Sequence, residues 1–139
     1  MTLKELSQLY YLNREIERDK QRLEDLKTRA CSLSGPNLTG MPGGGSFSGS
    51  SIDRQIAEIV DLESIISAKI KQCLHERNRL ERYIADIPDS LTRQIFTLRF
   101  INGLSWLQVA YHIGGYNTED SVKKICYRFI DRENEKERG

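Results

Sequence analysis

Between residues 117 and 128, polar and basic side chains are spaced so that they fall on one side of a helix. At about 100° per residue, Lys124 and Tyr127 lie opposite an apolar stripe that contains Val122 and Phe129. Amide, hydroxyl and ammonium groups can donate hydrogen bonds to base edges and to phosphate oxygens. The spacing therefore indicates a candidate nucleic-acid contact, made of Asn117, Thr118, Ser121, Lys123, Lys124, Tyr127 and Arg128.

The order of these residues along the helix suggests their roles. A helix that enters the major groove places its amino-terminal residues at the base edges, and its flanks lie near phosphates. The expected base readers are Asn117, Ser121 and Lys124, and the expected phosphate contacts are Lys123, Tyr127 and Arg128. The alternative interpretation is a solvated charged face that binds nothing.

The other reactive side chains are scattered. Cys31, Cys73 and Cys126 form no Cys-x-x-Cys pair, and neither His75 nor His112 lies near a cysteine at ligand spacing. A structural zinc site needs about four clustered ligands, so no metal or other cofactor is expected. The sequence also contains no plausible catalytic triad, no carboxylate pair in an apolar stretch and no nucleotide-binding loop. We expect no catalytic residues and no enzyme activity.

Two short helices joined by a glycine turn would position the candidate contacts. Ser105 followed by Gln108 predicts a capping box for the first helix. Gly114-Gly115 predicts its end, because glycine readily adopts the left-handed conformation. Asn117 followed by Asp120 predicts the cap of the second helix, whose buried stripe is expected to be Val122, Ile125, Cys126 and Phe129. This arrangement is typical of a helix-turn-helix.

A further helix is expected over residues 89–102, after Pro88, with Leu91, Ile95 and Leu98 inward. We therefore predict a three-helix domain at 88–132, followed by a polar, fraying tail at 133–139.

Two long helices are expected upstream, over residues 3–30 and 52–86. Each repeats apolar residues every seven positions, which predicts a coiled-coil seam. The repeats are Leu9, Ile16, Leu23 and Ala30 in the first helix, and Ile52, Ile59, Ile66, Cys73, Leu80 and Ile87 in the second.

Other features of these helices favour a hairpin. Asp19 interrupts the first seam, and Lys69 and Glu76 interrupt the second, which argues against a simple parallel zipper. Residues 34–51 are rich in Gly, Ser and Pro and are expected to form a flexible loop that lets the second helix fold back antiparallel. The resulting hairpin, residues 1–87, is expected to form a homo-oligomer, with a dimer favoured; a groove for a partner helix is the alternative. Ile56, Ile70 and Ile84 are expected to widen the second stripe.

Composition restricts the class of protein. The 139 residues include 21 basic and 20 acidic side chains, so the net charge of +1 argues neither for nor against nucleic acid. The sequence has no run of 18 apolar residues and begins without the apolar core of a signal peptide, so we expect a cytoplasmic protein that does not contact membranes. The predicted fold class is all-α: a long antiparallel helical hairpin followed by the helix-turn-helix domain.

The segment at 98–110, in which Leu98-Arg99-Phe100 precedes Gly103-Leu104-Ser105-Trp106, resembles the opening of region four of bacterial sigma factors. Nearly the whole chain resembles a family of small phage and prophage proteins of Gram-positive bacteria that carry a sigma-region-four-like domain. The resemblance rests on the two-helix first half, the Gly/Pro-rich loop and the segment at 114–124. It implies binding to double-stranded DNA and control of phage transcription inside the bacterial host cell, with RNA polymerase as a further candidate partner.

One departure from that family concerns charge. Sigma recognition helices usually open with Ser followed by basic residues, whereas here Glu119-Asp120 occupies the opening. Acidic groups suit a helix amino terminus but repel phosphate. Residues 88–132 hold six basic and four acidic side chains, a balance of +2, so we expect a single domain to bind DNA weakly and to need a second domain or RNA polymerase.

The expected function is therefore a sequence-specific DNA-binding transcription regulator of phage origin that oligomerises or docks through its coiled coil. One alternative is a small terminase subunit, which would assemble as a ring. The other is a protein-interaction module that binds RNA polymerase or an inhibitor without touching DNA, and Glu119-Asp120 favours it.

Overall fold

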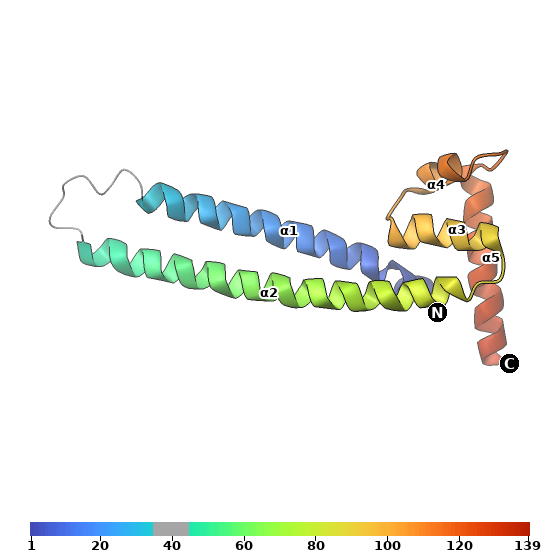
Figure 1. Ribbon diagram of the computed structural model, residues 1–139, viewed down its shortest axis with the longest axis horizontal. Helices are drawn as coiled ribbons and strands as arrows, with labels where there is room; N and C mark the ends of the chain where they lie inside the picture. The colour runs from blue at the N-terminus through green and yellow to red at the C-terminus, as the bar shows by residue number, and fades with distance from the viewer. Residues whose placement is uncertain (35–44) are drawn as a thin grey trace. The chain divides into compact units, whose positions relative to one another are not determined.

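The computed structural model describes residues 1–34 and 45–139, with side chains at 1–32 and 51–139 (Figure 1). Every regular element within these residues is a helix, which confirms the all-α class. The helices are α1 (Leu3–Ser34), α2 (Gly45–Ala85), α3 (Ser90–Phe96), a π-helical turn (Thr97–Ile101), α4 (Trp106–Ile113) and α5 (Glu119–Arg138). A search of the described helices finds no stretch both long and apolar enough to cross a membrane.

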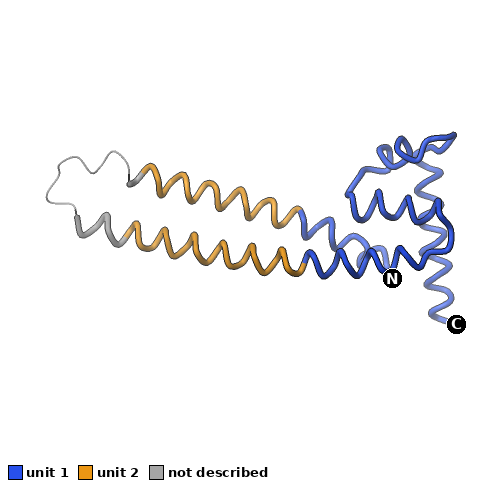
Figure 2. The backbone as a smooth tube through the Cα atoms, in the orientation of Figure 1, with its two compact units in different colours: residues 1–13, 73–139 blue, residues 14–72 orange. Residues whose placement is uncertain are grey.

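The chain divides into two compact units (Figure 2). One unit contains residues 1–13 and 73–139, and the other contains residues 14–72. The first unit is larger than the domain expected at 88–132, because the start of α1 and the end of α2 belong to it. Seven-residue periodicity shows which face of a helix is apolar, but it does not show which partner covers that face.

A single hydrophobic core holds the first unit together. Leu6 of α1 and Leu80 of α2 are 0% and 1% exposed, and both belong to the same cluster as Phe96, Val109 and Val122. Phe96 packs edge-on against Phe100 and Phe129, with ring centroids 5.3 and 5.4 Å apart. Each buried aromatic or aliphatic side chain of this kind contributes about 1.5–3 kcal/mol by leaving water. Residues 88–132 therefore share their core with both long helices.

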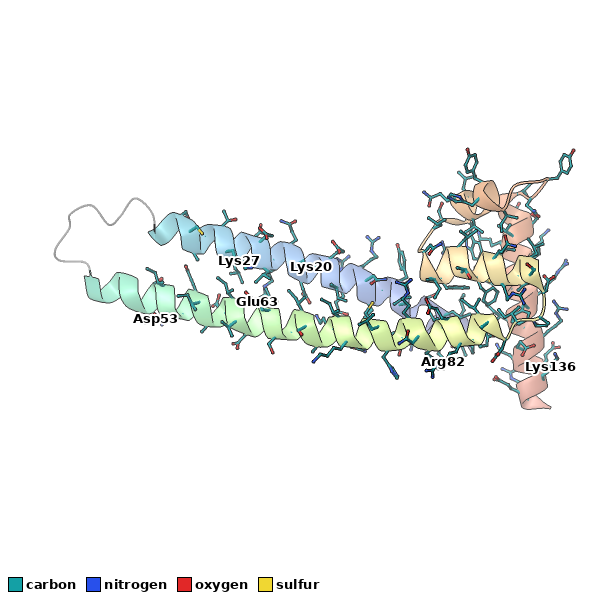
Figure 3. All side chains as sticks on the ribbon, viewed as in Figure 1. Lys20, Lys27, Asp53, Glu63, Arg82 and Lys136 are labelled. Carbon is teal, nitrogen blue, oxygen red and sulfur yellow. The ribbon has the colours of Figure 1, made fainter. Side chains whose placement is uncertain are left out.

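In the second unit, segments of α1 and α2 contact each other along a seam. Ile16, Leu62 and Ile66 are buried there. Lys69 Nζ hydrogen-bonds Asp19 Oδ2 and lies 3.0 Å from Glu15 Oε1. Lys27 Nζ lies 3.8 Å from Glu63 Oε1 (Figure 3). Residues later in α1 contact residues earlier in α2, so the two segments run in opposite directions.

The second seam differs from its expected composition. Ile56 and Ile70, expected to widen the stripe, are 51% and 39% exposed, so that prediction is wrong for both. The positions three residues after Ile59 and Ile66 are turned inward instead: Leu62 is buried and Lys69 is half-buried. Positions in a coiled-coil seam alternate in steps of three and four residues. Residue 69 therefore faces inward although its neighbour Ile70 is more hydrophobic than Lys69.

Two boundaries also differ from expectation. The loop expected at 34–51 is helical from Gly45 onward, and the rest of that prediction, residues 35–44, falls outside the described residues. The tail expected to fray at 133–139 is helical to Arg138. Ile130 is buried in the core, and the amino group of Met1 lies 3.5 Å from Glu137 Oε1, so tertiary contacts support the last turns of α5.

The Lys69–Asp19 pair yields a prediction about stability. Its hydrogen bond to Asp19, and then the one to Glu15, raise the pKa of Lys69. We expect Lys69→Glu and Asp19→Lys each to lower the melting temperature by several degrees, because each places like charges together in a half-buried seam. The double variant should recover much of the loss, measured by circular dichroism as a double-mutant cycle. Lys71→Glu, at an exposed position of α2, is the matched control. Strictly additive losses would contradict a direct interaction.

Candidate nucleic-acid interface

The first helix of the candidate site begins where the sequence predicts. Ser105 Oγ accepts a hydrogen bond from the backbone N–H of Gln108 at 3.2 Å, and Gln108 Oε1 accepts one from the backbone N–H of Ser105 at 2.9 Å. These two bonds confirm the capping box. Trp106, Val109 and Ala110 are buried, so one side of α4 packs into the core and the other faces outward.

The connection from α4 to α5 is a tight turn built on glycine. Gly114 and Gly115 have φ angles of 72° and 64°, which other residues rarely adopt. The side-chain amide of Asn117 donates a hydrogen bond to the carbonyl oxygen of Gly114 at 3.0 Å. Asn117 therefore closes the turn, and the prediction that it caps α5 is wrong.

Thr118 caps α5 instead. Its hydroxyl accepts a hydrogen bond from the backbone N–H of Ser121 at 3.2 Å, and Ser121 Oγ accepts one from the backbone N–H of Thr118 at 2.8 Å. Threonine is a common N-cap residue, because its hydroxyl can accept a hydrogen bond from a backbone N–H in the first turn. Asn117 instead bonds a nearby backbone carbonyl, a common competing use of its side chain.

Three of the seven predicted contact residues thus have local partners. Asn117 is half-buried with its amide engaged, while Thr118 and Ser121 are held in the reciprocal cap. Ser121 also donates its hydroxyl proton to the carbonyl oxygen of Thr118 at 3.0 Å. These three side chains shape and orient the amino end of α5, and a base edge would have to compete with those bonds.

The other four predicted residues follow on α5. Lys124 and Arg128 are exposed, Lys123 is half-buried, and Tyr127 is 37% exposed. The ring of Tyr127 packs edge-on against Trp106, with centroids 6.0 Å apart. Lys124 and Arg128 are therefore the two members of the set most available to a phosphate or a base.

The core-facing side of α5 agrees largely with the predicted stripe. Val122 and Cys126 are 0% exposed, whereas Ile125 and Phe129 are partly buried. Ile130, which is 5% exposed, was not predicted, although it lies four residues beyond Cys126 and so on the same helix face. Burial raises the pKa of the Cys126 thiol to about 12, so it stays protonated near neutral pH and packs as a small apolar group.

Acidic side chains lie at the opening of α5. Glu119 and Asp120 are both exposed in its first turn. Their charges interact favourably with the unpaired backbone N–H groups of a helix amino terminus. The positive charges of Lys123 and Lys124 follow one turn later, so positive potential on the outer side of α5 is stronger beyond its first turn.

Comparison of the chain with known proteins finds no match. No protein-family model matches it, and neither a curated protein nor a solved structure does.

Sequence reasoning did not identify an apolar surface beside these residues. A cavity of about 1020 Å³ lies between α4 and the start of α5, and its lining includes Leu107, Tyr111 and Glu119. Leu107 and Tyr111 are 67% and 83% exposed, and Tyr116 in the turn is fully exposed. The sequence signal for this surface is the spacing of Leu107 and Tyr111, which are one helical turn apart and lie on the side of α4 opposite the buried Val109.

Metal-ligating residues do not gather in the part of the chain that the structure describes. There, no group of three or more His, Cys, Asp or Glu side chains is arranged to hold a metal ion. Cys73 donates its thiol proton to Asn13 Oδ1 at 3.0 Å. The side chains exposed at the candidate interface can supply hydrogen bonds, charge and apolar contact.

Proposed function

We propose that this protein is a sequence-specific transcription regulator that binds double-stranded DNA, of the phage type that its sequence resembles. In this proposal, α4, the glycine turn and α5 act as a helix-turn-helix, with α5 as the recognition helix. The observation that carries the proposal is the two-sided character of α5. Val122 and Cys126 are fully buried on one side, while Lys124 and Arg128 are exposed on the other, directly after a tight turn.

Rigid support for α5 favours this role. The helix contacts both α3 and α4, and its amino end is held by the Thr118–Ser121 cap. Base reading needs side chains held on a firmly placed helix, because small displacements remove hydrogen bonds to base edges. The Ser105–Gln108 box and the buried Trp106 supply the same support to α4.

The charge of α5 favours a modest affinity for each chain. Lys123 and Arg128 are expected phosphate contacts, and Lys124 is an expected base reader. The negative charges of Glu119 and Asp120 oppose all three. We propose that α1 and α2 form an antiparallel hairpin that joins copies of the chain, so that two recognition helices act on one site. In the same proposal the protein is not an enzyme, works in the cytoplasm of the bacterial host, needs no cofactor, and has RNA polymerase as a further partner.

The proposal predicts a specific result for Lys124→Ala. The change removes one exposed charge without touching the core. If Lys124 contacts a phosphate, affinity should fall for all sequences and the dependence of log K on log salt should decrease by about one unit. If it contacts a base, binding should weaken by about 1–3 kcal/mol for one sequence position only. Fluorescence anisotropy with duplex prophage promoter fragments over a salt series measures both effects.

The matched control is Lys71→Ala on α2, which removes the same charge from an exposed position outside α5. If Lys71→Ala and Lys124→Ala have equal effects, only general charge matters and α5 is not the reading helix.

A second candidate function is a protein-interaction module that does not bind DNA. The observation that favours it is the apolar cavity beside Glu119, together with the exposed Leu107, Tyr111 and Tyr116. Exposed apolar surface rimmed by polar groups is typical of protein interaction sites. Wild-type protein that captures RNA polymerase subunits but shows no salt-dependent binding to any duplex would favour this candidate.

A further inference from the structure

One face of α2, beside the positions that pack against α1, carries apolar residues that stay largely exposed in the described part of the chain. Ile56, Val60, Ile70 and Leu74 are 51%, 57%, 39% and 56% exposed. With Glu63 and Ser67 between Val60 and Ile70, these residues follow one another along the helix in alternating steps of four and three residues. Alternating steps of three and four residues produce one stripe along a helix, as in the seam of a coiled coil. Thus α2 has the pattern of a second helix contact, which flanks the positions that face α1 and meets them at Glu63, the partner of Lys27.

The stripe can pair with the same stripe on a second, antiparallel copy of α2. Consider a second copy of α2 that runs antiparallel, related by a two-fold axis at the level of residue 65. Val60 then lies opposite Ile70 of the second copy, and Ile56 lies opposite Leu74 of the second copy. The two-fold symmetry repeats both pairs, so that four apolar layers form.

Charge distinguishes this register from a parallel one. The same antiparallel pairing places Asp53 opposite Arg77 of the second copy at both ends of the stripe. Asp53, labelled in Figure 3, is exposed and has no ion pair in the described part of the chain, whereas Arg77 lies 3.1 Å from Glu81. A parallel pairing would instead bring Asp53 against Asp53 and Arg77 against Arg77. Like charges directly opposed in a helix contact disfavour that arrangement.

The centre of the stripe is also compatible with a second copy. Glu63 would lie opposite Ser67 of the second copy rather than opposite another carboxylate. Its own charge is partly balanced by Lys27, whose Nζ lies 3.8 Å away. No buried like-charge pair therefore arises in the proposed contact.

We propose that α2 docks on α2 of a second copy of this chain, antiparallel, with Val60 against Ile70 and Asp53 against Arg77. This inference rests on the oligomerisation included in the proposed function and specifies its surface and register. The contact uses no residue of α5, so each copy in the dimer brings its own recognition helix.

A charge exchange across the contact tests both the surface and the register. Val60→Lys and Ile70→Glu should each place two unpaired charges in apolar layers and convert the dimer to a monomer. The double variant should restore the dimer, because Lys at 60 then faces Glu at 70 of the second copy in two layers. The two positions are ten residues apart on the same helix, which is too far for an ion pair within one chain.

Sedimentation equilibrium without DNA gives the readout. Wild type and the double variant should have twice the 16.0 kDa mass of one chain, and each single variant should have the mass of one chain. Ile65→Lys is the matched control, since Ile65 is 48% exposed but lies about 140° around the helix from Val60 and Ile70, and it should stay dimeric. Circular dichroism should show unchanged helicity throughout.

A monomeric wild type, or a dimeric Val60→Lys variant, would overturn the docking surface. A double variant that stays monomeric would overturn the antiparallel register. All masses are measured without DNA, so a failure of DNA binding by α5 is a separate result and leaves the dimer result unchanged.

Discussion

Val122→Asp is expected to unfold the unit that contains α3, α4 and α5. Val122 is 0% exposed and belongs to the cluster that includes Phe96, Val109 and Cys126. An unpaired carboxylate in such surroundings costs several kcal/mol even after relaxation, against a total stability of about 5–15 kcal/mol for an ordinary domain. We expect loss of the cooperative thermal transition for this unit and a large loss of helicity, measured by circular dichroism.

The control for this change is Leu107→Asp. It introduces the same charge at an apolar residue of α4 that is 67% exposed, in the first turn of the helix, where an acidic group is tolerated. The control should therefore keep the wild-type melting temperature within a few degrees. Equal stability of the two variants would show that Val122 does not pack in the core of this unit.

The second large effect is expected for the triple change Lys123→Ala, Lys124→Ala and Arg128→Ala. The three side chains supply the positive charge on and beside the exposed face of α5, and none belongs to the buried core. If that face lies on DNA, the phosphate contacts of Lys123 and Arg128 disappear together with the base or phosphate contact of Lys124. The dependence of log K on log salt should fall by about two to three units, and binding at physiological salt should be lost. Helicity and melting temperature should stay near the wild-type values, since alanine favours helix.

The matched control removes the same number of charges elsewhere: Arg18→Ala, Lys20→Ala and Arg22→Ala, all exposed on α1. Each triple variant lacks three positive charges of the wild-type chain, whose net charge is +1. Anisotropy on the same promoter fragments should separate them, with binding kept in the α1 variant. If the folded α5 variant binds like wild type, α5 does not read DNA, and the protein-interaction candidate gains support.

Local features of the site could be predicted from the sequence because neighbours in the chain produce them. Ser105 and Gln108 are three residues apart, so their reciprocal bonds depend only on the start of α4. Gly114 and Gly115 end the helix by their own conformational freedom. Val122 and Cys126 lie one turn apart and were recognised as buried by period alone. The exposure of Lys124 and Arg128 followed from the same period.

The sequence alone did not determine which of two adjacent residues caps α5. Asn117 and Thr118 are both good cap residues, and the choice depended on which side chain could reach another group. The turn places the carbonyl oxygen of Gly114 within 3.0 Å of the amide of Asn117, which leaves Thr118 to cap α5. The N-cap of α5 is therefore Thr118, one residue after the predicted Asn117, because of a hydrogen bond that forms only in the folded turn.

The tertiary structure decided which surfaces meet. Leu9 and Leu80 are coiled-coil positions in the sequence pattern, yet both belong to the core cluster that contains Phe96 and Val122. Asp19 and Lys69 appeared as separate interruptions of two seams, yet they bind each other. In each case the amino-acid pattern determined that a helix face is apolar or charged, because side-chain type and helical period are local. The partner of that face is set by contacts between residues far apart in the chain, and those depend on how all the helices pack together.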